Sequence, residues 1–158
     1  MAPGRPSLSI TYGNGSYLGE CIVVDGTPVE DGRGIFTWSN GDRYEGDFVR
    51  GVRSGRGIFS WSDGRRYEGG FLDDVRSGDG TMRWNDGTVY EGGFSEGLMS
   101  GRGRLVWPSG EWYEGDFLEG RMDGRGVHHA ADGTPIYEGD WVANCPVNRG
   151  GWDTEDGA

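Results

Sequence analysis

The sequence contains no lysine and no glutamine, and all 15 of its basic residues are arginine. Its 26 acidic residues give a formal net charge of −11 at pH 7. A charge of this sign repels the phosphates of nucleic acids and of anionic lipid surfaces. We therefore expect no nucleic-acid partner, and a membrane lipid is a conceivable but disfavoured ligand.

Cysteine is scarce, and long apolar runs are missing. Cys21 and Cys145 are far apart in the sequence, so they form neither a disulfide framework nor the ligand spacing of a zinc site. No segment approaches the roughly 18 apolar residues of a membrane-spanning helix, and the residues after Met1 lack the apolar run of a signal peptide. We expect a cytoplasmic protein without a metal or another cofactor.

The sequence also offers little for catalysis. Its two histidines are adjacent, and neighbouring side chains on a strand point to opposite faces, so His128 and His129 are not expected to act as a metal pair. No acid, base and nucleophile are spaced as a triad, and the Asp-Gly turns lack the ligand spacing of an EF-hand. We predict no catalytic, cofactor-binding or metal-binding residues and a protein that is not an enzyme.

Glycine and aromatic residues are abundant instead: 33 Gly, seven Trp, seven Tyr and six Phe. They recur at a fixed period. The pentapeptide Tyr44-Glu45-Gly46-Asp47-Phe48 returns in related form at Tyr67, Tyr90, Tyr113 and Tyr137, at intervals of 23 or 24 residues. Disordered chains are poor in aromatic residues, and a fixed period in this range is typical of stacked repeats.

Turn-forming pairs separate two strands in each repeat. Asn-Gly or Asp-Gly pairs, as at Asp63-Gly64, follow strands that end near tryptophan, as at Trp61, and such pairs favour β-hairpins. The pattern predicts an all-β fold without helices: a single-layer, extended, twisted antiparallel sheet of about six tandem hairpins. A flexible lead (1–8) precedes the repeat array (9–152), whose first and last units are degenerate, and an acidic tail (153–158) follows. The insertion at 22–31 predicts either a longer hairpin loop or an extended first hairpin.

Alternation along the strands places Tyr44, Gly46 and Phe48 on one face and the acidic residues on the other, solvated face. A turn centred near residues 51–54 would then pair aromatic residues with glycines, which leave room for a neighbouring ring. The predicted pairs are Phe48 with Gly57, Gly46 with Phe59, and Tyr44 with Trp61.

The tyrosine-containing pentapeptide, a turn, Gly-Arg-Gly, an aromatic strand and an Asp-Gly turn resemble the MORN (membrane occupation and recognition nexus) repeat over residues 10–152. The resemblance implies an extended, grooved sheet that holds partner peptides or helices, forms dimers and scaffolds cytoskeletal, flagellar or membrane-contact assemblies. Some members are attached to enzymes, and some have been proposed to bind phospholipids. The first unit, with its insertion, the His128-His129 strand and the broken last unit depart from the pattern.

A one-layer sheet leaves its aromatic face open, and exposed aromatic surface usually marks an interaction site. We predict that this face binds a peptide or helix of a partner protein, while the same rings also serve as the core. The predicted groove residues are Tyr44, Phe59, Trp61, Tyr67, Phe71, Trp84, Tyr90, Phe94, Trp107, Tyr113 and Phe117. Unpaired edge strands also predict a homodimer through a terminal repeat, with Trp141, Cys145 and Trp152 as its edge.

Three function classes remain. The first is an interaction scaffold associated with the cytoskeleton or a cilium. The second is an anionic-phospholipid-binding membrane tether, which the net charge disfavours. The third is a regulatory fragment of a larger enzyme. The start at Met1 and the fading of the repeat before Ala158 argue against this class, because they favour a complete chain.

Overall fold

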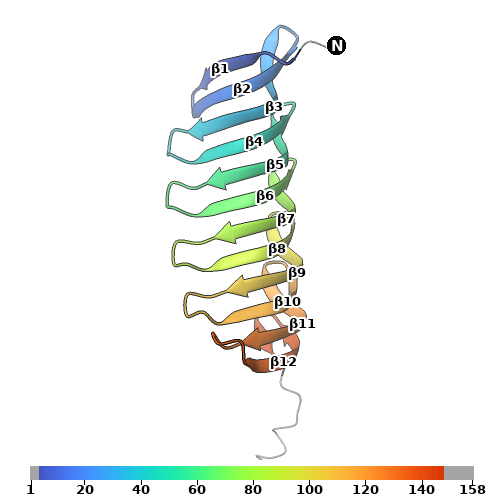
Figure 1. Cartoon of the computed structure of the whole chain (residues 1–158). Coiled ribbons are helices and arrows are strands. Elements are labelled where there is room, and N and C mark those ends of the chain that lie inside the picture. Colours follow the sequence, from blue (N-terminus) through green and yellow to red (C-terminus); the bar gives the residue numbers. More distant parts are fainter. Residues whose placement is uncertain (1–3, 148–158) are drawn as a thin grey trace, which may run out of the picture.

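The computed structural model describes residues 4–147, and these residues form one antiparallel sheet of thirteen strands without helices. Each strand pairs with its neighbours in the sequence, so the sheet is a meander. Figure 1 shows the hairpins stacked from β1 (Ser7–Tyr12) at the top to β12 (Pro135–Val142) at the bottom. The predicted all-β fold of tandem hairpins is confirmed.

The strands between these two are β2 (Gly15–Val24), β3 (Thr27–Trp38), β4 (Arg43–Val49), β5 (Val52–Ser60), β6 (Arg66–Leu72), β7 (Val75–Arg83), β8 (Val89–Ser95), β9 (Leu98–Val106), β10 (Trp112–Leu118) and β11 (Arg121–His129). The short strand β13 (Cys145–Pro146) follows β12. β1 begins two residues before the predicted start of the array, with Ser7 paired to Glu20. The predicted insertion lengthens the β2–β3 hairpin, which closes at the Val24–Thr27 pair.

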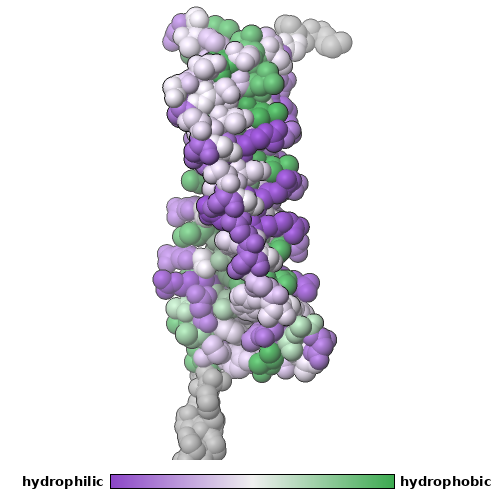
Figure 2. All heavy atoms as spheres, turned by 90° about the vertical axis from the view of Figure 1, so that its left-hand side faces the viewer, coloured by the Kyte–Doolittle hydropathy of each residue, from purple (hydrophilic) through white to green (hydrophobic). Residues whose placement is uncertain are grey.

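The turns along one edge of the sheet are built as their sequences predict. In the turn after β5, Gly64 has a φ of 104°, and its N–H donates to the carbonyl of Trp61 at 3.0 Å. In the next such turn the Asp86 carboxylate accepts the N–H of Thr88 at 2.9 Å. These turns lie on the left in Figure 1, and Figure 2 shows that this edge presents mainly hydrophilic residues with apolar ones between them.

The turns at the opposite edge contain two residues with positive φ, as tight hairpins require. Arg50 and Gly51 have φ values of 48° and 85°, and Asp73 and Asp74 have values of 47° and 72°. Figure 1 shows the strands bending away toward this edge.

A β-bulge produces the bend within each regular repeat. The pairing of β4 with β5 shifts between Gly46 and Phe48, next to Gly55, whose φ is 108°. Bulges bend and twist a strand. The bent end of the hairpin folds back over the tyrosine-bearing face. This position is shown by Arg53, whose guanidinium carbon lies 5.3 Å from the centre of the Phe59 ring.

The bulge makes the predicted register wrong. The structure pairs Tyr44 with Phe59, Gly46 with Gly57, and Phe48 with Arg53. The prediction assumed one continuous ladder from a turn at 51–54, whereas the turn lies at Arg50-Gly51 and the ladder is then interrupted. Glycine therefore faces glycine across neighbouring strands.

Aromatic rings nevertheless cover glycines, as expected. The covered glycine on the neighbouring strand lies diagonally from the tyrosine and not directly opposite it. A Cβ atom added to Gly80 would lie 2.5 Å from the Tyr67 ring and hydroxyl, so the ring occupies the space above the Gly69–Gly80 pair. The Tyr67 hydroxyl donates to the carbonyl of Gly70 at 2.8 Å. The Tyr67 ring also meets Phe71 and Phe94 edge-on, with centroids 5.2 and 5.0 Å apart. This unit recurs along the array and forms its core.

Candidate partner-binding face

We call the side of the sheet that bears the pentapeptide tyrosines the inner face, and the opposite side the outer face. On the inner face, Tyr44, Tyr67, Tyr90 and Tyr113 are 0% exposed. The phenylalanines of the predicted groove are also buried: Phe59, Phe71, Phe94 and Phe117. The bent hairpin ends cover the tyrosine rings, and all of these side chains belong to the core, although Phe59 and Phe71 also line an open cleft. A partner that meets this conformation does not touch the tyrosines.

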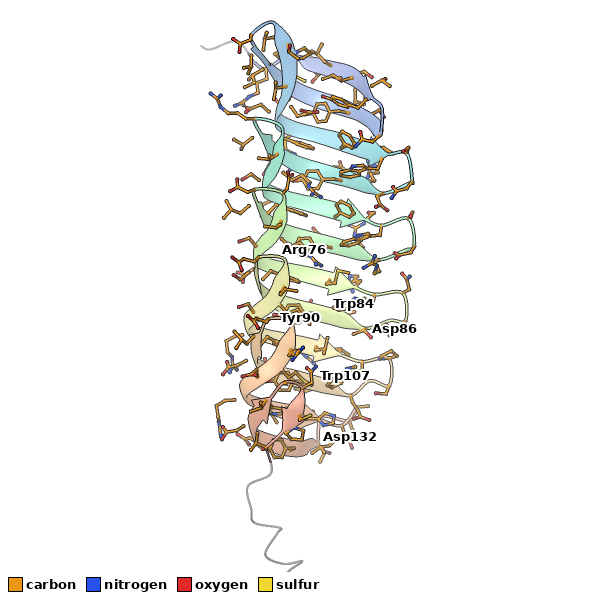
Figure 3. The ribbon with its side chains drawn as sticks, turned by 180° about the vertical axis from the view of Figure 1, so that it is seen from behind. Arg76, Trp84, Asp86, Tyr90, Trp107 and Asp132 are labelled. Atoms are coloured by element: carbon orange, nitrogen blue, oxygen red, sulfur yellow. The ribbon has the colours of Figure 1, made fainter. Side chains whose placement is uncertain are left out.

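Three predicted groove residues stay accessible: Trp61, Trp84 and Trp107 are half-buried. With Trp38 they form a row, which we call the tryptophan row, with one member per hairpin. The Trp38 and Trp61 rings each contact the phenylalanine two residues earlier, as where Trp61 meets Phe59 at a centroid distance of 4.6 Å. Figure 3 shows Trp84 and Trp107 one below the other beside the turns of Asp86 and Asp132, with Arg76 and Tyr90 nearer the bent strand ends.

Two arginines belong to this face, and the sequence-based site did not include them. Arg53 and Arg76 are equivalent residues of β5 and β7, each paired with the last residue of a pentapeptide. The Arg53 guanidinium lies over the rings of Trp38 and Phe71, at 5.6 Å from each centroid. The signal available in the sequence was the 23-residue spacing of two identical Val-Arg-Ser-Gly segments, but that spacing does not show which face the side chains reach.

The side chains of Arg53, Arg76 and Trp61 help to enclose an open cleft of about 270 Å³ on the inner face. Its lining residues come from three consecutive hairpins: Arg53, Phe59, Trp61, Phe71, Asp74, Val75, Arg76 and Gly97. The cleft combines aromatic walls with two cationic groups. Such a combination suits a ligand that has an apolar part and an acidic part.

Burial has opposite effects on the two ionisable residue types of this face. Loss of water raises the pKa of Tyr44, Tyr67, Tyr90 and Tyr113 to about 12, because the phenolate is disfavoured in the core. The same cause lowers the pKa of Arg76, because burial disfavours its charged form. The tyrosines are neutral at physiological pH, and the Arg76 charge is present in a partly desolvated place.

The outer face carries exposed charge, as predicted. Arg102 pairs with Asp116 at 3.5 Å and Arg33 pairs with Asp47 at 3.3 Å, and both arginines are mostly exposed. Exposed pairs of this kind contribute about 0–1 kcal/mol each. The residues that the structure describes contain no cluster of three or more His, Cys, Asp or Glu that could hold a metal ion.

The two histidines lie on opposite faces, which agrees with the prediction from alternation. His128 faces inward, with its Nε2 atom 2.8 Å from a carboxylate oxygen of Glu111 and its ring 5.5 Å from Trp107. His129 stacks on Trp112 with a centroid distance of 3.7 Å.

The predicted dimer edge divides into three cases. Trp141 is only 4% exposed, and its Nε1–H donates to the carbonyl of Gly126 at 3.1 Å, so it belongs to the core. Cys145 is exposed on β13. Trp152 and the predicted acidic tail lie outside the described residues.

Between Gly4 and Val147 there is also no helix long and apolar enough to cross a membrane.

Stacked β-hairpins with an aromatic core define a β-repeat protein. The family model described as MORN repeat matches residues 29–43, 44–65, 67–89, 90–112 and 113–134. The chain therefore belongs to the MORN repeat family. MORN repeats are generally protein- or membrane-interaction modules and are not enzymatic in themselves. No curated protein sequence matched the chain.

Proposed function

We propose that the protein is a non-enzymatic scaffold or adaptor whose inner face binds a peptide or helix of a partner protein. The observation that carries the proposal is the tryptophan row, because it leaves one large, half-buried aromatic side chain per hairpin at the surface. Tryptophan and arginine are the side chains that most often dominate binding energy at protein interfaces. A segment that runs along the stack would meet one such anchor in each of four successive repeats.

The test is affinity capture from an extract of the source organism with a double variant and a single variant. Trp61→Ala/Trp84→Ala removes two members of the tryptophan row. Trp112→Ala removes one half-buried tryptophan of the outer face and is the matched control. Circular dichroism verifies folding of each variant. A partner that is retained by the wild type and by Trp112→Ala, but lost by Trp61→Ala/Trp84→Ala, supports the proposal, whereas equal capture by all variants contradicts it.

A membrane lipid is the alternative ligand that the family allows. The net charge of −11 disfavours it, since anionic lipid surfaces repel an acidic protein. Co-sedimentation with anionic vesicles at low salt measures this directly. Binding that exceeds binding to neutral vesicles would favour the lipid over the protein partner. A regulatory role within a larger enzyme is a further alternative that the family allows.

The setting that we propose, a cytoplasmic cytoskeletal or ciliary assembly, follows from the family resemblance. A fluorescently tagged full-length chain in the source cells tests it. Co-localisation with cytoskeletal or ciliary markers is the expected result, and a diffuse signal that ignores these markers would contradict the setting.

A homodimer through a terminal repeat is a further part of the proposal. One edge of β1 has no strand paired with it among residues 4–147. Such an unpaired edge can add a strand from a second copy. Light scattering over a range of concentrations is expected to give twice the mass of one chain at the upper end. A constant monomer mass would remove the dimer and leave the partner-binding proposal unaffected.

A further inference from the structure

Arg76 is a half-buried cation without an acidic partner. Its Nη2 donates to the carbonyl of Gly97 at 2.8 Å, and its Nη1 lies 3.6 Å from the Sδ atom of Met82. Its guanidinium carbon lies 5.5–5.7 Å from the centres of three rings: Trp61, Tyr67 and Phe94. None of the ion pairs among residues 4–147 involves Arg76.

The equivalent arginine one repeat earlier has the partner that Arg76 lacks. The Arg53 Nε donates to the Asp74 carboxylate at 3.1 Å, and its Nη2 donates to the Asp74 carbonyl at 2.9 Å. Gly97 stands where the next repeat would need an aspartate, so only the carbonyl contact remains there. The difference between the two arginines is therefore one carboxylate at one turn position.

The place of the missing carboxylate is open to a ligand. Gly97 and both arginines line the cleft of about 270 Å³, next to Trp61 and Val75. A Cβ atom added to Gly97 would have no neighbour within 4 Å, so the space beside the Arg76 guanidinium is unfilled by the residues described. A buried or half-buried charge is costly unless a partner of opposite charge compensates it.

We propose that the cleft binds the carboxylate of an Asp or Glu side chain in the partner segment, with Arg76 as the counter-ion and a neighbouring apolar side chain of that segment against Trp61. This rests on the proposed function and specifies its ligand chemistry. A guanidinium offers two parallel N–H donors that match a carboxylate. The carboxylate would repeat in trans what Asp74 does for Arg53.

A lipid headgroup fits this place less well. The turns beside the cleft carry exposed acidic side chains, Asp73, Asp74 and Glu96, and the whole chain is acidic. A single acidic side chain can reach between them, but a surface of many phosphates would be repelled. The proposal therefore commits to a protein segment.

Variants can fill or empty the site while keeping the fold. Gly97→Asp gives Arg76 an internal carboxylate at a position whose φ of 83° resembles the 72° of Asp74. Gly120→Asp adds the same charge at an equivalent turn with a φ of 84°, but the side chain that faces this turn is Met99 and not an arginine. Arg76→Met removes the cation, and methionine already occupies the equivalent position in the next two repeats, as Met99 and Met122.

The experiment selects binding peptides from a random 12-residue display library with the full-length wild-type chain. The selected peptides are then synthesised, and their affinities for the wild type and the variants are measured by fluorescence anisotropy. We expect selected peptides to share an Asp or Glu next to a large apolar residue. Changing the acidic residue of the peptide to Asn or Gln should weaken binding by roughly tenfold. The Gly97→Asp and Arg76→Met proteins should show a similar roughly tenfold loss, while Gly120→Asp should match the wild type.

The outcomes separate this inference from the function on which it rests. The selected peptides could bind at the tryptophan row but show no preference for an acidic residue, and bind Gly97→Asp as tightly as the wild type. That result would overturn the inference and leave the proposed function intact. Failure to select any peptide would overturn both. Binding to phosphatidylserine vesicles that Arg76→Met abolishes, or self-association that Gly97→Asp abolishes, would assign the cleft to another occupant and overturn the inference.

Discussion

At the scale of single residues, the pentapeptide tyrosine fills the space above glycines of its own strand and of the neighbouring strand. Its ring covers two paired glycines, and its hydroxyl donates to a carbonyl three residues later, as from Tyr90 to Gly93 at 2.8 Å. Glycine usually weakens a strand, but here its missing side chain is the space that the ring fills. Tyrosine and glycine are therefore enriched together because each needs the other.

Adding one methyl group under a tyrosine ring should destabilise the protein. In Gly80→Ala the new Cβ would lie 2.5 Å from Tyr67, so the ring must move in a closely packed core. Such overpacking costs about 1–3 kcal/mol in the free energy of unfolding, measured by urea denaturation. Gly13→Ala is the control, because its Cβ would have no neighbour within 4 Å. Equal midpoints for both variants would show that the glycine–ring contact is unimportant.

The buried tyrosines should make the protein sensitive to alkali. Burial raises the pKa of Tyr44, Tyr67, Tyr90 and Tyr113 to about 12, whereas an unfolded chain has tyrosine pKa values near 10. The unfolded state thus loses protons first, so stability is complete below about pH 10 and falls as the pH rises toward 12.

Lysine, which also titrates in this range, is absent from the chain. Tyrosinate absorbance and far-ultraviolet circular dichroism are therefore expected to change together in one step above pH 10. Ionisation of these four tyrosines near pH 10 in a folded protein would contradict their burial.

The sequence predicted much of the residue-scale picture and missed one part of it. Alternation correctly placed Tyr44 and Phe48 on one face, with Glu45 on the other, because that property depends only on strand geometry. The position of Arg53 over the aromatic rings was not predictable in the same way. It depends on the bend of the hairpin, which brings a distant part of the strand back over the inner face.

At the scale of the hairpin, the fourth residue of the pentapeptide distinguishes two forms of the bulge. Where it is aspartate, its carboxylate accepts a backbone N–H across the bulge, as from Arg125 to Asp116 at 3.0 Å. The glycine beside the bulge then has a φ near 110°, as at Gly124 (111°). Where it is glycine, as at Gly70, the glycine beside the bulge has a smaller φ, 77° at Gly78.

Removal of the aspartate carboxylate should weaken the first form. Asp116→Ala leaves the Arg125 N–H without its partner, and the loss of one hydrogen bond at a partly exposed site costs about 1 kcal/mol in the free energy of unfolding. Glu114→Ala removes the same charge from the same strand at an exposed position and is expected to change stability little. Chemical denaturation of both variants measures the difference. A loss for Glu114→Ala as large as that for Asp116→Ala would indicate a general charge effect instead.

The bulge also explains why the repeat pattern predicts the correct hairpins but the wrong register. Each repeat contains several glycines, and a turn centred at 51–54 and a tight turn at Arg50-Gly51 followed by a bulge both join the same two strands. The hydrophobic pattern has a period of two, so a shift by two residues preserves every inner and outer position. The observed alignment packs the tyrosine ring on the Gly46–Gly57 pair and lets the Asp47 carboxylate accept the Arg56 N–H across the bulge at 2.9 Å.

At the scale of the whole molecule, each hairpin pairs only with its neighbours along the stack. The repeated core therefore tolerates variation at the surface positions that recur once per hairpin. One such position carries Arg53, Arg76, Met99 and Met122 in successive repeats. Because Arg53 pairs with Asp74, this variation leaves Arg76 as the uncompensated cation at this position and places methionine there in the next two repeats.

The accessible part of the inner face could be predicted only in outline. The period indicated an aromatic face, and three of the tryptophans predicted to contact a partner are half-buried there. The tyrosines and phenylalanines of the same prediction are core residues, because the bent hairpin ends cover them. A single-layer sheet without bends would have left all of these rings open.

The central claim is that a partner segment binds along the tryptophan row. The most direct measurement is a nuclear magnetic resonance titration of the ¹⁵N-labelled chain with a selected peptide, following the assigned indole N–H signals of its seven tryptophans. The predicted result is that the Trp61 and Trp84 signals shift in proportion to occupancy, while that of Trp112 on the outer face does not. Shifts confined to Trp112, with Trp61 and Trp84 unchanged at saturation, would contradict the account.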